Sequence, residues 1–210
     1  MLRAIARGQV VATDLGRANG EVFTLMASIG LDAHVVHELA AARRGGISHL
    51  SYVAPLLRSL RGYAAQRLRV IADGTRIDDE SPGFVMIANS RHYALRLNPL
   101  RRADCADGLL DVLWIPSAGV ASILGWVARI AMGSHTDHSR VVEARAALIA
   151  VECDEPFLYQ LDGDPPWAIP VGQGVDRLEA TIAAGALRVL VGDGGGQAPG
   201  AARARVEDAS

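Results

Sequence analysis

The sequence contains no lysine, only two cysteines and few aromatic residues. All 21 of its positively charged residues are therefore arginines, and the 23 acidic residues bring the formal net charge to −2. A net charge so close to zero gives no overall attraction to nucleic acid, so we expect no nucleic-acid partner. Cys105 and Cys153 are far apart and form no Cys-x-x-Cys pair, which argues against a disulfide framework and indicates a reducing cytosol.

Long apolar runs are missing as well. The longest, residues 118–133, is too short to span a bilayer and contains Arg129, so we expect a core helix there. The first ten residues lack the apolar segment of a secretory signal. No Gly-x-x-x-x-Gly-Lys phosphate loop is present, and no Gly-x-Gly-x-x-Gly sequence follows a predicted strand. These absences favour a cytoplasmic protein and give no sign of a common nucleotide loop.

Strands outnumber helices in the predicted secondary structure. Strands are predicted at 9–15, 21–28, 68–79, 83–90, 108–116, 139–152, 157–167 and 176–192, with a hairpin on Asp73-Gly74 in the segment 68–79 and a closing hairpin in the segment 176–192. Helical spacing of apolar residues predicts helices at 31–44, 54–65 and 118–132. Most of the turns need no crossover helix, which favours a mainly β, α+β fold with antiparallel sheets packed face to face as a two-layer sandwich. We expect one domain over residues 1–191 and a disordered Gly- and Ala-rich tail over residues 192–210.

Two carboxylates, Asp162 and Asp164, lie on either side of Gly163, directly after an apolar run. The Asp-Gly pair favours a tight hairpin turn, and Pro165-Pro166 would end the strand that follows. These residues can therefore form a plain turn. Alternatively, the turn holds one carboxylate toward a cleft, where it acts as a general base for a substrate hydroxyl or as a metal ligand.

A second acidic segment contains Asp104 and Asp107, three positions apart and followed by Gly108-Leu109. Aspartates of this kind can simply cap surface turns. Alternatively, the two carboxylates and a backbone carbonyl from the following Gly-Leu form a hard-oxygen site suited to Mg²⁺ that keeps several waters. The sequence alone leaves both interpretations open.

Polar and positively charged residues follow the strand predicted at 83–90. The segment from Asn89 to Arg96 includes Arg91 and Tyr93 and is either a solvated loop or one wall of a site for an anionic ligand. The histidine pairs 34/37 and 135/138 are each spaced i, i+3, as a zinc site on a helix would need. Neither pair has the cysteine or glutamate neighbours of a common zinc motif, so zinc binding is disfavoured.

Taken together and in this order, six segments resemble the diacylglycerol kinase-like lipid kinases. This family includes bacterial diacylglycerol kinase B and YegS-type kinases and the eukaryotic sphingosine and ceramide kinases. The matching segments are DLGRANGEVFTLMASIGLDAHVV, VMIANSRHYALRLNP, ADGLLDVLWI, GSHTDHSRVV, YQLDGDPPW and ALRVLVG. The resemblance covers about residues 2–192.

The resemblance implies a fold and a reaction. The fold is the C-terminal β-sandwich domain of a two-domain kinase, and the N-terminal nucleotide-binding domain is expected to be absent from this chain. The reaction transfers the γ-phosphate of ATP to a hydroxyl of diacylglycerol or a sphingoid-type lipid, at a membrane that the protein contacts peripherally. A homodimer is left open. The alternative is a non-catalytic module that binds lipid or a partner. A phosphotransferase similar to NAD kinase is a third interpretation, and ADGLLDV argues against it.

The resemblance also implies roles for individual residues. Asp164 stands where the family has a catalytic glutamate, which accepts the proton of the lipid hydroxyl. Asp104, Asp107 and the backbone carbonyl of Leu109 match the spacing of the Mg²⁺ site in bacterial members. The residues expected near the substrate or the phosphate are Asp162, Asn89, Arg91 and Tyr93.

Overall fold

The computed structural model of the chain describes residues 10–42, 63–91 and 98–191. Tyr93, the tail at 192–210 and all but the last three residues of the helix expected at 54–65 lie outside these ranges. Residues 63–65 are described and are not helical. Neither helix in the described part of the chain is long and apolar enough to cross a bilayer.

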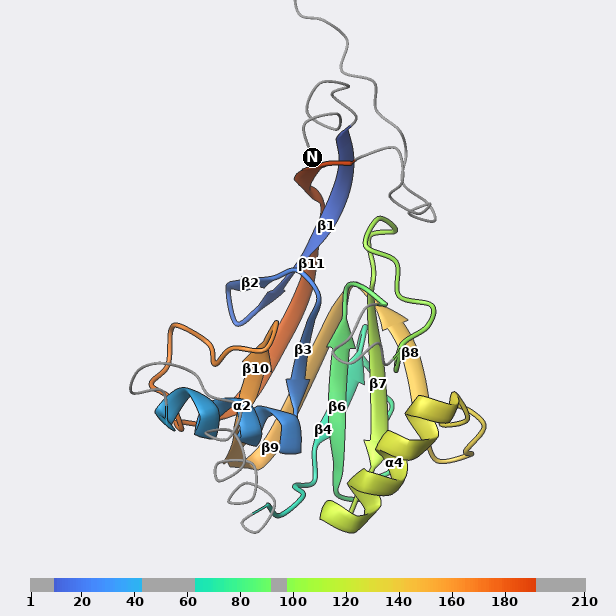
Figure 1. Cartoon of the computed structure of the whole chain (residues 1–210), viewed down its shortest axis with the longest axis vertical. Coiled ribbons are helices and arrows are strands. Elements are labelled where there is room, and N and C mark those ends of the chain that lie inside the picture. Colours follow the sequence, from blue (N-terminus) through green and yellow to red (C-terminus); the bar gives the residue numbers. More distant parts are fainter. Residues whose placement is uncertain (1–9, 43–62, 92–97, 192–210) are drawn as a thin grey trace, which may run out of the picture.

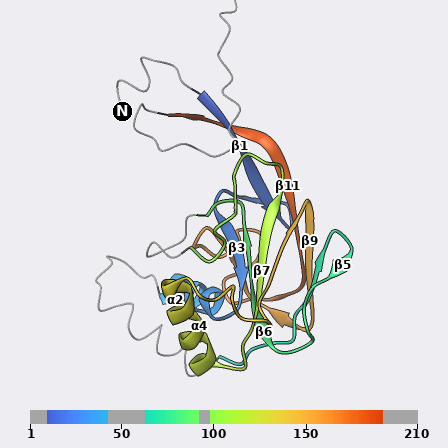
Figure 2. The same ribbon diagram turned by 90° about the vertical axis from the view of Figure 1, so that its right-hand side faces the viewer.

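Two antiparallel sheets pack face to face, and two helices cover the outer face of one of them (Figures 1 and 2). The six-stranded sheet has the order β2-β1-β11-β9-β4-β5, and the five-stranded sheet has the order β10-β3-β6-β7-β8. The strands are β1 (Val10–Ala18), β2 (Glu21–Phe23), β3 (Met26–Ile29), β4 (Arg69–Ala72), β5 (Thr75–Arg76), β6 (Gly83–Ala88), β7 (Leu110–Pro116), β8 (Val142–Ala146), β9 (Leu148–Phe157), β10 (Tyr159–Leu161) and β11 (Val175–Leu190). This architecture confirms the predicted mainly β sandwich.

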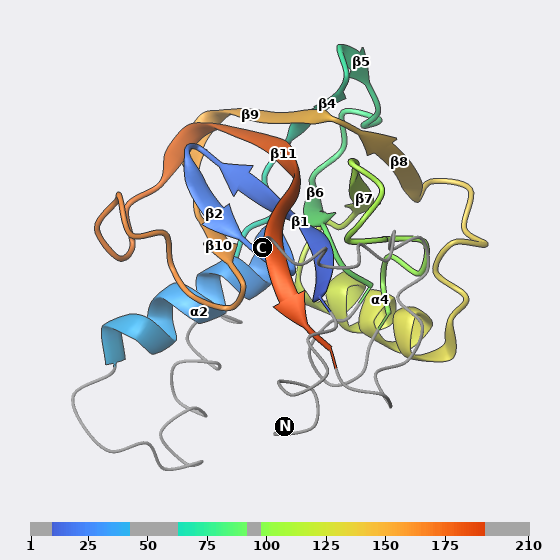
Figure 3. The same ribbon diagram turned by 90° about the horizontal axis from the view of Figure 1, so that it is seen from above.

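The helices are α2 (Leu31–Ala42) and α4 (Val120–Met132), and both lie on the outer side of the five-stranded sheet (Figures 2 and 3). Side chains from both sheets, among them Phe23, Trp114 and Leu178, fill the space between the sheets. A second apolar cluster joins Trp126 and Ile130 of α4 to the other face of the five-stranded sheet. Strands β6 and β7 are therefore buried on both faces, so their sequences are continuous apolar runs.

Two segments predicted as single strands are each divided between the two sheets. Residues 21–28 form β2 in one sheet and β3 in the other, and residues 139–152 contribute β8 and the beginning of β9 in the same way. At both crossings, the carboxylate of an Asp-Gly turn accepts backbone N–H groups. Asp73 binds the amides of Ala147 and Leu148, and Asp162 binds those of residues 24–26. Because these amides are satisfied outside the ladder, the strand can leave one sheet for the other.

The hairpin predicted at residues 176–192 is wrong. The segment forms one 16-residue strand, β11, and its far end extends with β1 beyond the sandwich (Figure 1). Gly185 does adopt a left-handed conformation, with φ 61°, but it lies at a β-bulge where the register with β1 shifts between Thr13 and Leu15. The glycine therefore marks an irregular ladder and not a reversal of the chain.

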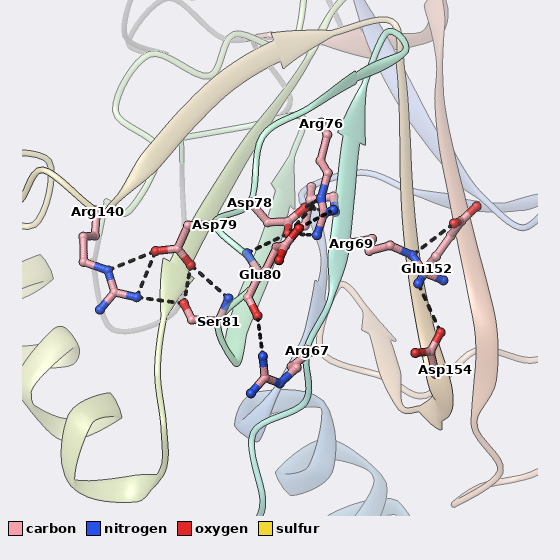
Figure 4. A network of polar contacts seen from close by, with 11 residues as sticks. Arg67, Arg69, Arg76, Asp78, Asp79, Glu80, Ser81, Arg140, Glu152 and Asp154 are labelled. Atoms are coloured by element: carbon pink, nitrogen blue, oxygen red, sulfur yellow. Dashed lines mark hydrogen bonds and ion pairs between the residues drawn. The ribbon is translucent and has the colours of Figure 1, made fainter.

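Ion pairs hold the loop that follows β5 against its neighbours (Figure 4). Arg76 contacts Asp78 at 2.7 Å, and Arg140 contacts Asp79 at 2.9 Å. This loop precedes Gly83, at the opposite end of β6 from Ala88, so the network lies away from the candidate site described next.

Candidate functional site

One end of the five-stranded sheet gathers the residues that the sequence singled out. The register aligns Leu161 with Ala27, Ala27 with Ile87, and Ile87 with Val112. Four segments therefore leave the sheet side by side at this end, which we call the site edge: residues 162–164, 24–25, 89–91 and 104–109. It lies toward the top of the five-stranded sheet in Figure 1.

The Asp162-Gly163 pair forms a two-residue hairpin turn, as predicted. Both residues have positive φ, 51° and 93°, as a type I′ turn requires. Leu161 and Asp164 close the turn with two backbone hydrogen bonds of 2.9 Å each. Asp164 is exposed at the end of this closed turn, within the site edge. The two backbone hydrogen bonds hold the main chain at Asp164 in place. The catalytic role of Asp164 stays a prediction.

Asp162 faces the chain itself. Its carboxylate accepts hydrogen bonds from the N–H groups of Thr24, Leu25 and Met26 at 2.6, 2.8 and 2.9 Å and from the Thr24 hydroxyl at 2.8 Å. The two aspartates of the turn therefore differ, since Asp162 stabilises the β2–β3 crossing. Its expected proximity to substrate or phosphate stays a prediction.

Asp14, in the middle of β1, stabilises the site edge through buried hydrogen bonds. The sequence interpretation did not identify this residue. Its side chain is 4% exposed, and its carboxylate accepts the N–H groups of Gly108 and Gly185 at 2.7 Å each. Its own N–H donates to the carbonyl of Cys105 at 2.6 Å. One carboxylate thus ties the 104–109 loop to β1 and β11. The available signal was an aspartate at an inward-facing position of a strand, because buried charges need partners.

Asn89 connects Asp14 to the segment that Asp162 binds. Its Nδ2 donates to the carbonyls of Asp14 and Thr24 at 2.8 and 3.0 Å, and its backbone N–H donates to Leu25 at 2.9 Å. The side chain is buried, and within the described part of the chain its Oδ1 accepts no hydrogen bond. A continuous set of hydrogen bonds therefore runs from Asp162 to the 104–109 loop.

The 104–109 loop carries the predicted Mg²⁺ ligands. One oxygen of Asp104 accepts the N–H of Ala106 at 3.2 Å, and one oxygen of Asp107 accepts the N–H of Leu109 at 3.0 Å. The other Asp107 oxygen pairs with Arg145. Across residues 10–42, 63–91 and 98–191, no group of three or more His, Cys, Asp or Glu side chains is placed to hold a metal ion. The predicted ligand set has only two carboxylates and a carbonyl, so it stays a prediction.

Arg91 lies close enough to this loop for its positive charge to act on the Cys105 thiol, where it opposes a rise in the pKa. Burial is the main cause of that rise, and the Asp104 carboxylate adds to it. Asn89 and Arg91 are therefore brought to the same site edge as the two acidic segments. Whether they contact a substrate stays a prediction.

Both predicted histidine pairs include a structural member. The buried His37 accepts the N–H of Gly172 at Nδ1 (2.8 Å), so its ring proton is on Nε2, which donates to the carbonyl of Tyr159 at 2.9 Å. His135 is also buried, and its Nε2 lies 2.7 Å from the carbonyl of Pro99. His37 joins α2 to β10, and His135 joins the segment after α4 to the loop at Pro99. The spacing of the pairs did not predict either role.

Asp111, at the beginning of β7, gives the site edge a dependence on pH. It is 3% exposed, and burial raises its pKa to about 6, with Glu143 and Asp104 adding to the rise and Arg102 opposing it. Nε of Arg145 lies 3.5 Å from its Oδ1 and also favours the charged form. Because the folded protein binds this proton more tightly than the unfolded chain, the free energy of unfolding falls as the pH rises through the range from the ordinary carboxyl pKa to about 6.

We therefore expect Asp111→Asn to be more stable than the wild type by about 1–3 kcal/mol at about pH 8, and nearly equal to it at about pH 4. Urea unfolding at both pH values, without divalent ions, measures the difference. Asp137→Asn, at an exposed position, controls for the change in net charge. A stability difference that is the same at both pH values would contradict the assignment.

Three comparisons with known proteins identify the family and the fold. Residues 26–191 match a family described as the YegS C-terminal NAD kinase beta sandwich-like domain. A diacylglycerol kinase of Mycobacterium tuberculosis (strain ATCC 25618 / H37Rv) is 28% identical over 183 residues, which are 85% of this chain and 58% of that relative. A diacylglycerol kinase of Staphylococcus aureus (strain Newman) is 22% identical over 170 residues, which are 80% of this chain and 53% of that relative.

The fold is also found in a crystal structure of a diacylglycerol kinase from Bacillus anthracis str. Sterne. The TM-score is 0.61 at 19% sequence identity, and the match covers 90% of this chain and 59% of that one. The chain therefore spans less than two thirds of the length of these relatives.

Proposed function

Because the chain belongs to the family of YegS C-terminal NAD kinase beta sandwich-like domains, we propose that it is the C-terminal, lipid-acceptor part of an ATP-dependent lipid kinase. The acceptor is a hydroxyl of diacylglycerol or of a sphingoid-type lipid. Two relatives that carry the name diacylglycerol kinase support the reaction class. The observation that carries the proposal is the closed turn that presents Asp164 at the same sheet edge as the 104–109 loop.

Asp164 has the position and the chemistry of a general base. A carboxylate at an exposed, rigid tip can accept the proton of a lipid hydroxyl while the hydroxyl oxygen attacks the γ-phosphorus and the bond to the β–γ bridging oxygen breaks. Asp162 keeps that tip in place through its three amide contacts. In this proposal, Asp162 orients the turn and Asp164 accepts the proton.

The residues of the 104–109 loop fit Mg²⁺ by their donor chemistry. Asp104, Asp107 and the Leu109 carbonyl offer hard oxygen atoms within one short loop, and Mg²⁺ commonly keeps its remaining ligands as water. Bound there, the ion would neutralise negative charge beside the acidic edge. Arg145 competes for Asp107, because it already pairs with that carboxylate.

ATP is the proposed co-substrate. We propose that it binds to a domain that corresponds to the segment of the relatives outside the matched region. Phosphoryl transfer depends on the positioning of the phosphates, so the proposed activity requires both parts. Because the acceptor is a lipid, we also propose peripheral contact with the membrane in which it resides.

The test joins this chain to the segment of the M. tuberculosis relative that precedes the matched region. We expect the joined protein to transfer radiolabelled γ-phosphate from ATP to diacylglycerol or sphingosine in mixed micelles with Mg²⁺, and neither part alone to do so. A joined protein that is folded and binds ATP, yet phosphorylates neither lipid, would overturn the proposal. Co-sedimentation of the chain alone with liposomes would then favour the non-catalytic binding module.

A further inference from the structure

A polar connection that begins at Gln160 supports the turn in addition to the contacts of Asp162. The N–H of Gly163 donates to Oε1 of Gln160 at 2.6 Å. The Nε2 of Gln160 donates to the hydroxyl of Ser28 at 2.6 Å, and that hydroxyl donates to the carboxylate of Asp32. The connection therefore leads from the turn, through β10 and β3, to the first turn of α2.

The direction of each hydrogen bond is fixed by chemistry. A backbone N–H can only donate, so the Oε1 of Gln160 must face Gly163, and its amide nitrogen must face Ser28. The hydroxyl of Ser28 then has its single proton for Asp32. Gln160 and Ser28 are opposite each other in the strand register and only 3% and 1% exposed, so water does not compete for the hydrogen bond between them.

We propose that Gln160 and Ser28 are positioning residues for the reaction assigned to Asp164. This inference rests on the proposed function and extends it to two residues that do not touch the substrate. Gly163 is the one residue of the turn without a side chain to restrain it, and its amide is held by Gln160. Asp162, the residue before Gly163, is held by the amides of residues 24–26. The two residues of the turn are therefore held by separate sets of contacts.

The expected effect on catalysis follows from geometry. If the Gly163 amide is released, the peptide between Asp162 and Gly163 can rotate, and the carboxylate of Asp164, the next residue, moves relative to the acceptor hydroxyl. A displacement of about 1 Å can lower the rate on the order of 10²-fold. A buried glutamine that only filled space in the sheet would not have this effect.

Amide hydrogen exchange of the full 210-residue chain tests the structural step without any activity. In Gln160→Met, we expect exchange of the Gly163 amide to rise about tenfold, while the amides of residues 24–26 keep their protection. In Gln160→Glu, the buried side chain in its protonated form keeps an acceptor for Gly163 and a donor for Ser28, so it should preserve the protection of the Gly163 amide. Gln173→Met, at an exposed position, is the matched control. Unchanged exchange of Gly163 in Gln160→Met, or an equal rise at all amides, would overturn the proposal.

Steady-state kinetics of the joined protein tests the functional step. Gln160→Met should lower kcat on the order of 10- to 100-fold and leave the KM for ATP unchanged, and Gln160→Glu should restore most of the loss. If the wild-type joined protein is inactive, the proposed function fails, while the exchange data still decide whether Gln160 holds Gly163. If the wild type is active and Gln160→Met keeps its kcat, the positioning role is wrong and the proposed function stands.

Discussion

Replacing Asp14 by asparagine is expected to lower the free energy of unfolding by about 3 kcal/mol, because a buried amide then loses its acceptor. The two carboxylate oxygens of Asp14 accept the N–H groups of Gly108 and Gly185, which belong to separate elements. In asparagine one of these oxygens becomes an NH₂ group, which can only donate. That group would face a backbone N–H in a site that is 4% exposed, so one hydrogen bond is lost and two donors oppose each other.

Urea unfolding followed by circular dichroism measures this loss. Asp176→Asn, at an exposed position of β11, is the matched control and should change the free energy of unfolding by less than about 0.5 kcal/mol. Equal stability of the two variants would show that Asp14 does not hold the loop and β11 together. Faster exchange of the Gly108 and Gly185 amides in Asp14→Asn would identify the bonds that were lost.

The elements that local sequence determines were predicted well. The apolar spacing gave α2 and α4, and the Asp-Gly pairs gave the turns at residues 73–74 and 162–163. The strand crossings at residues 24–25 and 147 were missed because the period of two continues through both of them. What ends the strands there is an aspartate far away in the sequence, Asp162 or Asp73, and no local pattern contains that information.

The candidate site was predictable in its parts and not in its assembly. The spacing of Asp104 and Asp107 placed them on one loop, and the turn placed Asp164 beside Asp162. That both segments leave the same sheet edge follows from the register of four strands, which is set by long-range pairing. The buried roles of Asp14 and Gln160 likewise depend on partners from other elements.

The different surroundings of the two aspartates in the turn predict opposite consequences for matched substitutions. In the joined protein, Asp164→Asn should lower kcat on the order of 10²- to 10⁴-fold, the usual contribution of a general base. Its free energy of unfolding should stay within about 0.5 kcal/mol of the wild type, because the side chain is exposed.

Asp162→Asn is the control for Asp164→Asn, since both changes remove one charge from the same turn. The carboxylate of Asp162 accepts three amide N–H groups, so we expect the Asp162→Asn variant to lose about 1–3 kcal/mol of unfolding free energy.

Asp164→Glu separates a base from a simple surface charge. It moves the carboxylate outward by about one methylene, or roughly 1 Å, and the rate of proton transfer to a base is sensitive to that distance. If Asp164→Asn and Asp164→Glu both keep the wild-type kcat, the proton is accepted elsewhere. Turnover that is lost in Asp164→Asn and clearly changed in Asp164→Glu, in either direction, would support a base at this position, whereas turnover that is lost in Asp164→Asn and unchanged in Asp164→Glu would indicate a surface charge.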